Sequence, residues 1–269
     1  SLYFTTSVLD TTSVINTTSV LNTNTSTKYS LWVLDVSSAA IPVRLNSDVT
    51  SSSFTNELVP QSHFLMPLGS KLIFSAADGV NGTELWVTGG TLATTQLLKD
   101  IDATAGEGSF PSDFAAIGSS VVFAASDGVH GRELWITDGT AGNTKLLKDI
   151  FPGGDPAFPN SSSPSALTTV GGLVYFSADD GVSGVEPWVT DGTPAGTRLV
   201  KNINMNTATL NDGPFFIPTG SAPAGFTALG SWVLFMADDG VHGMELWRTD
   251  GTAAGTALVK DINPTHNPS

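Results

Sequence analysis

One sequence phrase recurs along the chain and limits what the chain can fold into. Its clearest copies read Glu-Leu-Trp-x-Thr-Asp-Gly-Thr, as in residues 133–140 and 245–252. The tryptophans of the successive copies lie 54, 49, 53 and 59 residues apart, and they are Trp32, Trp86, Trp135, Trp188 and Trp247. A repeat of about 40–50 residues is typical of propeller blades and of helical arrays.

The pattern inside each copy decides between these two architectures. In the copy spanning 167–203, four short apolar runs occupy 167–170, 173–178, 185–190 and 197–203, with turn residues between them. Asp-Gly between apolar runs is a strong hairpin signal, because Gly accepts a positive φ. No run shows the 3.6-residue period of a helix. Each copy is therefore predicted to be a four-stranded antiparallel meander.

The second run of each copy is apolar on both faces, as in the Val-Val-Phe-Ala-Ala of residues 121–125. Such strands suit sheets that are covered on both sides, which blades in a ring achieve by stacking on their neighbours. We therefore predict an all-β chain, a single β-propeller domain of about five four-stranded antiparallel blades over residues 1–269. The expected blades are 1–50, 51–102, 103–151, 152–204 and 205–263.

The first blade is expected to be incomplete at the N-terminus, because residues 2–5 resemble a second strand rather than a first. Three hexapeptides, TTSVLD, TTSVIN and TTSVLN, follow directly. They are predicted to form an extended insert, residues 5–27, between the second and third strands. The alternative is a Ser/Thr-rich loop that carries O-linked glycans. Ring closure is expected either from the tail after Ile262 or from further sequence beyond one end.

In such a meander, the connections between blades and the turns between second and third strands emerge on one rim. The Asp-Gly-Thr turns emerge on the opposite rim. The longest connections between blades are 151–166 and 204–225. Variable loops on a rigid scaffold are where binding usually resides.

Composition excludes several classes of partner. Charged residues make up 13% of the 269 residues, and the formal net charge is −14. This balance argues against nucleic acid and anionic membranes, which require clusters of Lys and Arg. No apolar run has the length of a membrane span. The chain has no cysteine, which excludes thiol chemistry, and because it begins at Ser1 without a leader we expect a processed or partial chain.

The Asp-Gly turns raise the question of calcium, because Asp carboxylates recur in them. Calcium takes about six to eight oxygen ligands, and the alternating D-x-D-x-D-G pattern is absent. We therefore predict turn caps and no metal or other cofactor, and the only low-ranking metal candidates are Asp78, Asp127, Asp180 and Asp239.

Equivalent polar residues end these turns, and they are candidates for a ligand site on the rim: His130, His242, Asn81 and Ser183. Four Asn-x-Ser/Thr sequons are candidate glycosylation sites in a secreted protein: Asn16, Asn24, Asn81 and Asn160.

Two further sets of residues recur with the repeat. Glutamates open the third run and lysines close the fourth, which predicts one ion pair within or between blades: Glu84, Glu133, Glu186 and Glu245, with Lys99, Lys148, Lys201 and Lys260. The repeat tryptophans are predicted to pack between blades, with sugar stacking as the alternative. No HExxH, GxSxG, P-loop or dinucleotide fingerprint occurs, so we predict no catalytic residue and no enzymatic activity.

The full phrase E-L-W-x-T-D-G-T-x-x-G-T-x-L-V-K-D-I resembles the ELWxxDGT repeat family of large secreted or surface-attached proteins of bacteria and some algae. The resemblance covers about residues 64–262. It implies a repeat architecture and an extracellular or cell-surface location, and it supplies no catalytic residue. The five-bladed tachylectins are an analogy of fold only.

These observations together predict an extracellular structural or adhesive module within a larger surface assembly. Its expected partners are other extracellular proteins or glycans, with no nucleic acid and no membrane insertion. The alternative is a lectin with quasi-equivalent sites between blades. The third hypothesis is a hydrolase or lyase with its site on the loop face.

Overall fold

A computed structural model describes residues 65–209 and 216–264, together with the backbone of seven strands between residues 6 and 50. The described chain is all-β apart from two single-turn 3₁₀ helices, η2 (Leu92–Thr94) and η3 (Ala141–Asn143). Most strands belong to four-stranded antiparallel sheets, which we number 1 to 5 in chain order. The predicted all-β class of four-stranded antiparallel sheets is therefore confirmed.

Sheets 2 to 5 each run in simple chain order, as a meander does. Sheet 2 contains β8 (Leu65–Leu68), β9 (Lys71–Ala77), β10 (Thr83–Thr88) and β11 (Gln96–Lys99). Sheet 3 contains β12 (Ser112–Ile117), β13 (Ser120–Ser126), β14 (Arg132–Thr137) and β15 (Lys145–Lys148). Sheet 4 contains β18 (Ser165–Val170), β19 (Leu173–Asp179), β20 (Val185–Thr190) and β21 (Arg198–Leu199). Sheet 5 contains β24 (Ala224–Leu229), β25 (Trp232–Asp238), β26 (Met244–Thr249) and β27 (Ala257–Lys260).

Sheet 1 differs from the prediction, because it has four strands and the hexapeptides form the first two. It contains β1 (Thr6–Leu9), β2 (Ser13–Thr17), β5 (Leu31–Asp35) and β6 (Val43–Arg44). Successive hexapeptides are equally rich in β-branched residues, so they pair with each other, Val8 opposite Val14. The first blade is thus not short of a strand, and its insert is not the whole of 5–27.

The rest of that segment forms a separate three-stranded sheet of β3 (Leu21–Thr23), β4 (Ser26–Tyr29) and β7 (Val49–Thr50). Residues 2–5, which were expected to be a second strand, lie outside the described residues.

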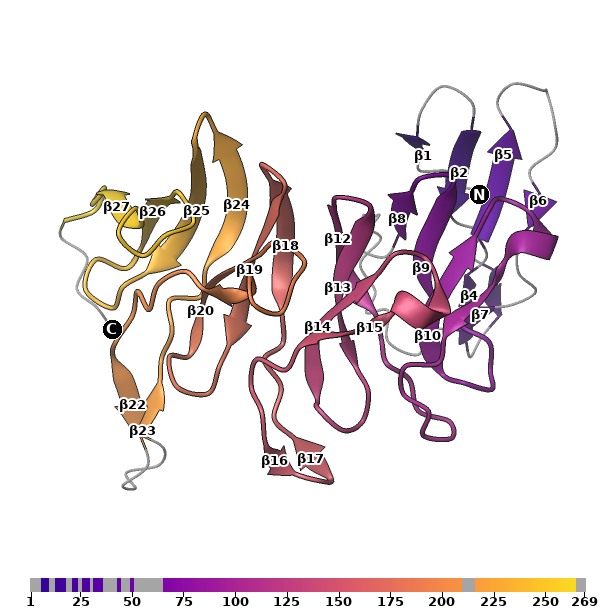
Figure 1. The fold of residues 1–269 in the computed structure, drawn as a ribbon, viewed down its shortest axis with the longest axis horizontal. Coiled ribbons are helices and arrows are strands. Elements are labelled where there is room, and N and C mark those ends of the chain that lie inside the picture. Colours follow the sequence, from indigo (N-terminus) through magenta and orange to yellow (C-terminus); the bar gives the residue numbers. More distant parts are fainter. Residues whose placement is uncertain are drawn as a thin grey trace.

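The sheets follow one another across the molecule, and sheets 1 and 5 lie at opposite ends (Figure 1). The first strands of sheets 2 to 5, namely β8, β12, β18 and β24, lie next to one another in that order. Two hairpins, β16 (Gly154–Asp155) with β17 (Phe158–Pro159) and β22 (Thr207–Thr209) with β23 (Phe216–Pro218), extend from connections between sheets. Both hairpins lie at the lower edge in Figure 1. The described sheets form an open arc rather than a closed ring.

The hydrophobic core lies between neighbouring sheets rather than within any one of them. One cluster joins sheets 2 and 3, a second joins sheets 3 and 4, and a third joins sheets 4 and 5. Trp135, Trp188 and Trp247 each contribute to one cluster from the third strand of their sheet. Each is opposite a phenylalanine of the second strand, as Trp135 is opposite Phe123. Burying a large apolar side chain of this kind stabilises by about 2–3 kcal/mol, so stacking of the sheets supplies much of the stability.

Three of the four described repeat tryptophans, Trp135, Trp188 and Trp247, are at most 6% exposed, and Trp86 is half-buried. Packing between sheets is thus what the structure shows. In the described part of the chain, the Nε1 atoms of these four tryptophans are buried without a hydrogen bond.

Candidate functional site

The turns between second and third strands are built on a capping aspartate. In sheet 3, Oδ1 of Asp127 accepts hydrogen bonds from the backbone N–H groups of Val129 and His130, at 3.0 and 2.8 Å. Oδ2 accepts a third bond from Nδ1 of His130 at 2.7 Å. A carboxylate that accepts several bonds from its own turn fixes the turn conformation. The other sheets repeat this arrangement with Asp78, Asp180 and Asp239.

The four rim candidates are all capping partners of these aspartates. Asn81 donates its amide to Asp78 at 2.7 Å, and Ser183 donates its hydroxyl to Asp180 at 3.2 Å. His242 binds Asp239 at 2.7 Å as His130 binds its own aspartate. Because these carboxylates only accept, each histidine donates from Nδ1, and within the described residues its Nε2 makes no hydrogen bond.

Electrostatics at the histidine turns follow from this pairing. The hydrogen bond to Asp127 raises the pKa of His130, whose side chain is 41% exposed, and His242 has the same arrangement at 38% exposed. Burial alone would raise the pKa of Asp127, but the bonds from the turn and from His130 hold it below its usual value. No group of three or more His, Cys, Asp or Glu side chains that could hold a metal ion occurs within the described ranges.

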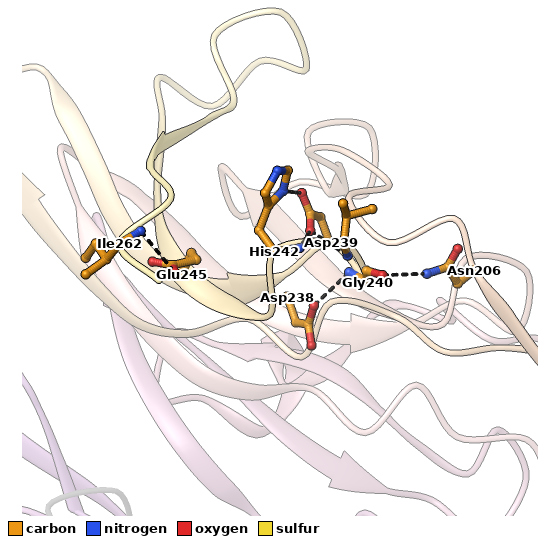
Figure 2. A network of polar contacts seen from close by, with 8 residues as sticks. Asn206, Asp238, Asp239, Gly240, His242, Glu245 and Ile262 are labelled. Carbon is orange, nitrogen blue, oxygen red and sulfur yellow. Dashed lines mark hydrogen bonds and ion pairs between the residues drawn. The ribbon is translucent and has the colours of Figure 1, made fainter. Parts of the chain in front are cut away.

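The connections between sheets reach these turns, as the meander topology predicted. The amide of Asn206, on the connection into sheet 5, donates to the carbonyl of Gly240 at 3.3 Å (Figure 2). Asp102 and Phe151 lie against the corresponding glycines of sheets 3 and 4, Gly128 and Gly181. One rim therefore combines the capped turns with the most variable loops of the chain.

Beneath this rim lies a feature that the sequence reasoning missed, a buried contact that we call the Glu–Ser clasp. Glu133 at the start of β14 is fully buried, and its Oε1 accepts from the N–H of Ser162 at 2.8 Å. Its Oε2 accepts from the N–H of Ile150 at 2.8 Å and from the hydroxyl of Ser162 at 2.6 Å. Ser162 belongs to the connection that leads into sheet 4, so one carboxylate binds the exit of sheet 3 and the entry to sheet 4.

The clasp also contacts the body of the next sheet. The carbonyl of Ser162 accepts from the N–H of Asp179 at the end of β19, at 2.9 Å. The N–H of Ser163 donates back to the carbonyl of Arg132 in β14, at 3.1 Å. Ser162 thus joins the third strand of one sheet to the second strand of the next.

The same clasp occurs at the two neighbouring junctions. Glu84 accepts from Ile101 N–H, Ser109 N–H and the Ser109 hydroxyl, at 2.9, 2.8 and 2.6 Å. Glu186 accepts from Ile203 and Asn204 N–H at 3.1 and 3.0 Å and from the hydroxyl of Ser221. Burial raises the pKa of all three glutamates, and it raises the pKa of Glu186 to about 7.

A short sequence signal accompanies each clasp. The serine is followed by a residue with positive φ, at 48°, 46° and 47° for Phe110, Ser163 and Ala222. A proline comes next, so the three segments read Ser-x-Pro at 109–111, 162–164 and 221–223. Left-handed backbone in non-glycine residues is uncommon and marks a position that the surroundings fix.

The predicted Glu–Lys ion pairs are wrong. Lys148 is paired with Leu134 across β14 and β15, so it lies on the face opposite to the adjacent Glu133. Its Nζ instead donates to the carbonyl of Thr197 in the next sheet at 2.8 Å, and Lys201 donates to Thr256 at 2.9 Å. Lys148 and Lys201 therefore link neighbouring sheets, but through backbone carbonyls.

The Asp-Gly-Thr turns on the opposite rim are held by their own hydroxyls. In sheet 3, Thr137 and Thr144 share a hydrogen bond of 2.7 Å, and Thr140 donates to Asp138 at 2.6 Å. The repeat phrase is thus scaffold at this end too.

The sequons have varied positions. Asn160 donates its amide to the carbonyl of Pro152 at 3.1 Å, and the serine of its sequon is the buried Ser162. Asn81 is occupied by its turn aspartate. Asn16 lies in β2, and Asn24 lies outside the described residues.

Comparisons with known proteins concern the fold. No family matches the sequence, and no curated protein matches it. A Mycobacterium tuberculosis puromycin-hydrolyzing peptidase is similar in structure, with a TM-score of 0.50 and 13% identity over 95% of this chain and 37% of that one. The Pyrococcus horikoshii acylaminoacyl peptidase gives a TM-score of 0.46 at 13% identity, over 93% of this chain and 36% of its own. Bacteroides ovatus xyloglucan PUL GH43B gives 0.35 at 14% identity, over 75% and 41%.

The chain therefore spans about a third of the length of the peptidases that it matches. The likeness to the Mycobacterium tuberculosis peptidase concerns the fold, and it agrees with the stacked four-stranded sheets described above. The prediction that the chain is not an enzyme is wrong, because the puromycin-hydrolyzing peptidase that it resembles in fold is an enzyme, and the fold thus gives no ground for excluding catalysis. At these identities the likeness extends to the fold and assigns no reaction. Within the described residues, no helix is long and apolar enough to cross a membrane.

Proposed function

We propose that sheets 1 to 5 are successive blades of a β-propeller in an extracellular or cell-surface protein of the ELWxxDGT type. In this proposal the chain is a structural and adhesive module whose rim contacts other extracellular proteins. The repeat phrase and the low share of charged residues support the extracellular assignment. The rim supports the contact role.

The observation that carries the contact role is an exposed valine at the tip of every described capped turn. Val80, Val129, Val182 and Val241 are 73, 69, 81 and 60% exposed, although each belongs to a turn that hydrogen bonds fix. The connections beside them add Phe158 and Met205, each 81% exposed. Apolar side chains that recur on a rigid exposed rim are typical of contact surfaces for other proteins.

This arrangement favours protein contact over sugar binding. A lectin with quasi-equivalent sites would need an exposed aromatic platform in every blade, and the repeat tryptophans of sheets 3 to 5 are buried between the sheets. Each turn instead offers one apolar tip beside one polar partner, with the imidazole Nε2 of His130 or His242 available as a hydrogen-bonding group. The proposal concerns the contacts of the module, and it applies equally if the module is part of a larger enzyme.

The test is adhesion of the purified chain to immobilised surface proteins and, in parallel, to a glycan array. Replacing the four tip valines by serine should abolish binding to proteins. Leu92 is the matched control, because it is also exposed, at 62%, but lies in η2 after the Gly89-Gly90 turn on the opposite rim. Leu92→Ser should leave adhesion unchanged. Sugar-specific binding that survives the valine replacements would overturn the proposal in favour of a lectin.

A further inference from the structure

The outer face of sheet 5 exposes residues whose counterparts are buried in sheets 2, 3 and 4. Val259 is 48% exposed, whereas its counterparts Leu98, Leu147 and Val200 are 6, 4 and 2% exposed. Ile262 is 68% exposed, whereas its counterparts are at most 7% exposed, namely Ile101, Ile150 and Ile203. In sheets 2 to 4, the next sheet covers these positions.

Leu229 and Met236 extend the same surface. Leu229 is 61% exposed, and its counterpart in sheet 3, Ile117, is 6% exposed. Met236 is 38% exposed at the position where sheet 3 has the fully buried Ala124. We call the surface formed by Leu229, Met236, Val259 and Ile262 the sheet 5 face. A rigid apolar surface of this kind is typical of an interface whose partner is missing.

The Glu–Ser clasp of sheet 5 is also half filled. Glu245 accepts from the N–H of Ile262 at 3.1 Å (Figure 2). It also accepts from the N–H of Asn263 at 3.2 Å. The other three clasp glutamates bind, in addition, a serine hydroxyl from the connection into the following sheet. Within the described residues no serine hydroxyl reaches Glu245.

A lysine contact of sheets 3 and 4 is also absent from sheet 5. Lys148 and Lys201 each donate to a threonine carbonyl of the following sheet. Within the described ranges their counterparts Lys260 in sheet 5 and Lys99 in sheet 2 make no such bond, so this contact is not common to all junctions. The exposed apolar surface and the half-filled clasp are therefore the features that indicate the partner, because three filled copies of the clasp show what binds there.

We propose that the sheet 5 face is a docking surface for one further sheet of the same repeat, led by a Ser-x-Pro segment. The serine of that segment binds Glu245 through its N–H and hydroxyl. A carbonyl of its Asp-Gly-Thr-type turn accepts from Lys260, and its apolar second and third strands cover the sheet 5 face. This inference concerns what packs against sheet 5, and its test is independent of the proposed contacts of the rim.

The repeat itself argues for this occupant. The covered faces of sheets 2, 3 and 4 each lie against a sheet whose leading connection ends in Ser-x-Pro, whatever the length of that connection. The alternative occupant is sheet 1, which would close a ring. In the structure sheet 1 lies at the far end of the arc from sheet 5 (Figure 1).

The first experiment supplies the missing partner. Residues 1–264 are followed by a second copy of residues 151–203, which contains the connection with Ser162 and sheet 4. Hydrogen exchange of the amides in 257–263 is compared with that in the parent chain. Covering the face should slow this exchange by about tenfold or more, because the amides then open only with the junction.

The matched control is the same extended chain with serine replaced by alanine at the copied equivalent of Ser162. Its protection should fall by about tenfold, since the clasp bond to Glu245 is lost. A folded extension that leaves the exchange of 257–263 unchanged would contradict the proposal.

A second measurement needs no extension and therefore remains decisive if the longer chain fails to fold. In the parent chain, Val259→Asp should leave the melting temperature within about 2 °C, because a charge on a free surface is solvated. Leu147→Asp, at the covered counterpart, should abolish cooperative melting. If Val259→Asp is as damaging as Leu147→Asp, then the face is already covered, and simultaneous loss of protection in sheet 1 would identify sheet 1 as the occupant.

Discussion

Removing the clasp glutamate should have very different consequences in sheet 3 and sheet 5, although the residue and its place in the repeat are the same. Glu133→Ala leaves three donors without an acceptor, namely the N–H of Ile150 and the N–H and hydroxyl of Ser162. Ser162 is 1% exposed, and Ile150 is 5% exposed, so water does not replace the carboxylate. Each buried donor without a partner costs about 1–3 kcal/mol, and such losses are not additive. We expect about 4 kcal/mol of lost unfolding free energy.

Glu245→Ala removes the acceptor of two backbone donors only, those of Ile262 and Asn263. Ile262 is 68% exposed, so water can solvate the freed N–H groups. The expected loss is about 1 kcal/mol or less. The comparison isolates the clasp, because both substitutions remove the same side chain at the start of the same strand.

The assay is urea unfolding at mildly alkaline pH, where the carboxylates are ionised, followed by tryptophan fluorescence. Ser162→Ala should cost about 2 kcal/mol, the value of a hydrogen bond to a charged group. The double substitution should cost at least about 1 kcal/mol less than the sum of the two single ones, because the residues share one interaction. If Glu245→Ala is as costly as Glu133→Ala, or if the sheet 3 losses are additive, the clasp is not the junction that we describe.

Three further predictions follow from single sites. Burial raises the pKa of Glu186 from 4.5 to about 7, so the folded state keeps this proton to higher pH than the unfolded chain does. The proton therefore stabilises the folded state by up to about 3 kcal/mol below pH 4.5, and this stabilisation should be lost as the pH rises to about 7. Urea titrations should show this slope in the parent chain, and an unchanged slope in Glu186→Gln would refute the assignment. Asp127→Asn should lower the pKa of His130 toward its ordinary value in an NMR titration, and an unmoved pKa would mean that the pair does not form in solution. Gly131→Ala should cost about 2 kcal/mol or more, because φ is 68° and a Cβ would overlap the carbonyl of Asn160; Gly142→Ala, with open space around it, is the control expected to be neutral or slightly stabilising.

The strands of sheets 2 to 5 could be predicted because their signals are local. Asp-Gly and Gly-Gly turns lie within a few residues of the strands that they connect, and the apolar runs between them are strand-like in the sequence itself. The second strand β19 illustrates this, because it was expected over 173–178 and extends over Leu173–Asp179. Local chemistry also placed the capping aspartates correctly at the turns.

The hexapeptides show that local sequence signals can predict a strand without predicting its pairing partner. Their β-branched residues correctly indicated extended structure, but propensity does not select a pairing partner. The two hexapeptides of β1 and β2 pair with each other, and β2 then pairs with β5, which the periodicity of the repeat could not reveal.

The clasp escaped prediction for a related reason. Glu133 and Ser162 are 29 residues apart, and the corresponding separations at the other junctions are 25 and 35 residues. A contact without constant spacing cannot be seen as a motif. The usable signal was Ser-x-Pro, which recurs at each junction at a different distance from the repeat phrase. The glutamates were instead assigned to lysines, which do recur at constant spacing but point to the other face of the sheet.

The variable spacing of the clasp explains how one scaffold can carry different rim loops. Each carboxylate binds both ends of a connection, the isoleucine N–H where it leaves one sheet and the serine where it enters the next. The isoleucine and the serine are 8 residues apart at the first junction, 12 at the second and 18 at the third. Because closing a longer loop costs only about 0.6 kcal/mol for each doubling of its length, the residues between the two ends are free to differ.

The second and third connections use this freedom to form the hairpins β16–β17 and β22–β23, while the junctions beneath them keep the same geometry. Selection for a new contact can therefore act on the rim without disturbing the packing of the sheets. The buried glutamate of each clasp, rather than the tryptophan of the repeat phrase, is therefore the residue that keeps the packing of the sheets constant while the rim loops differ.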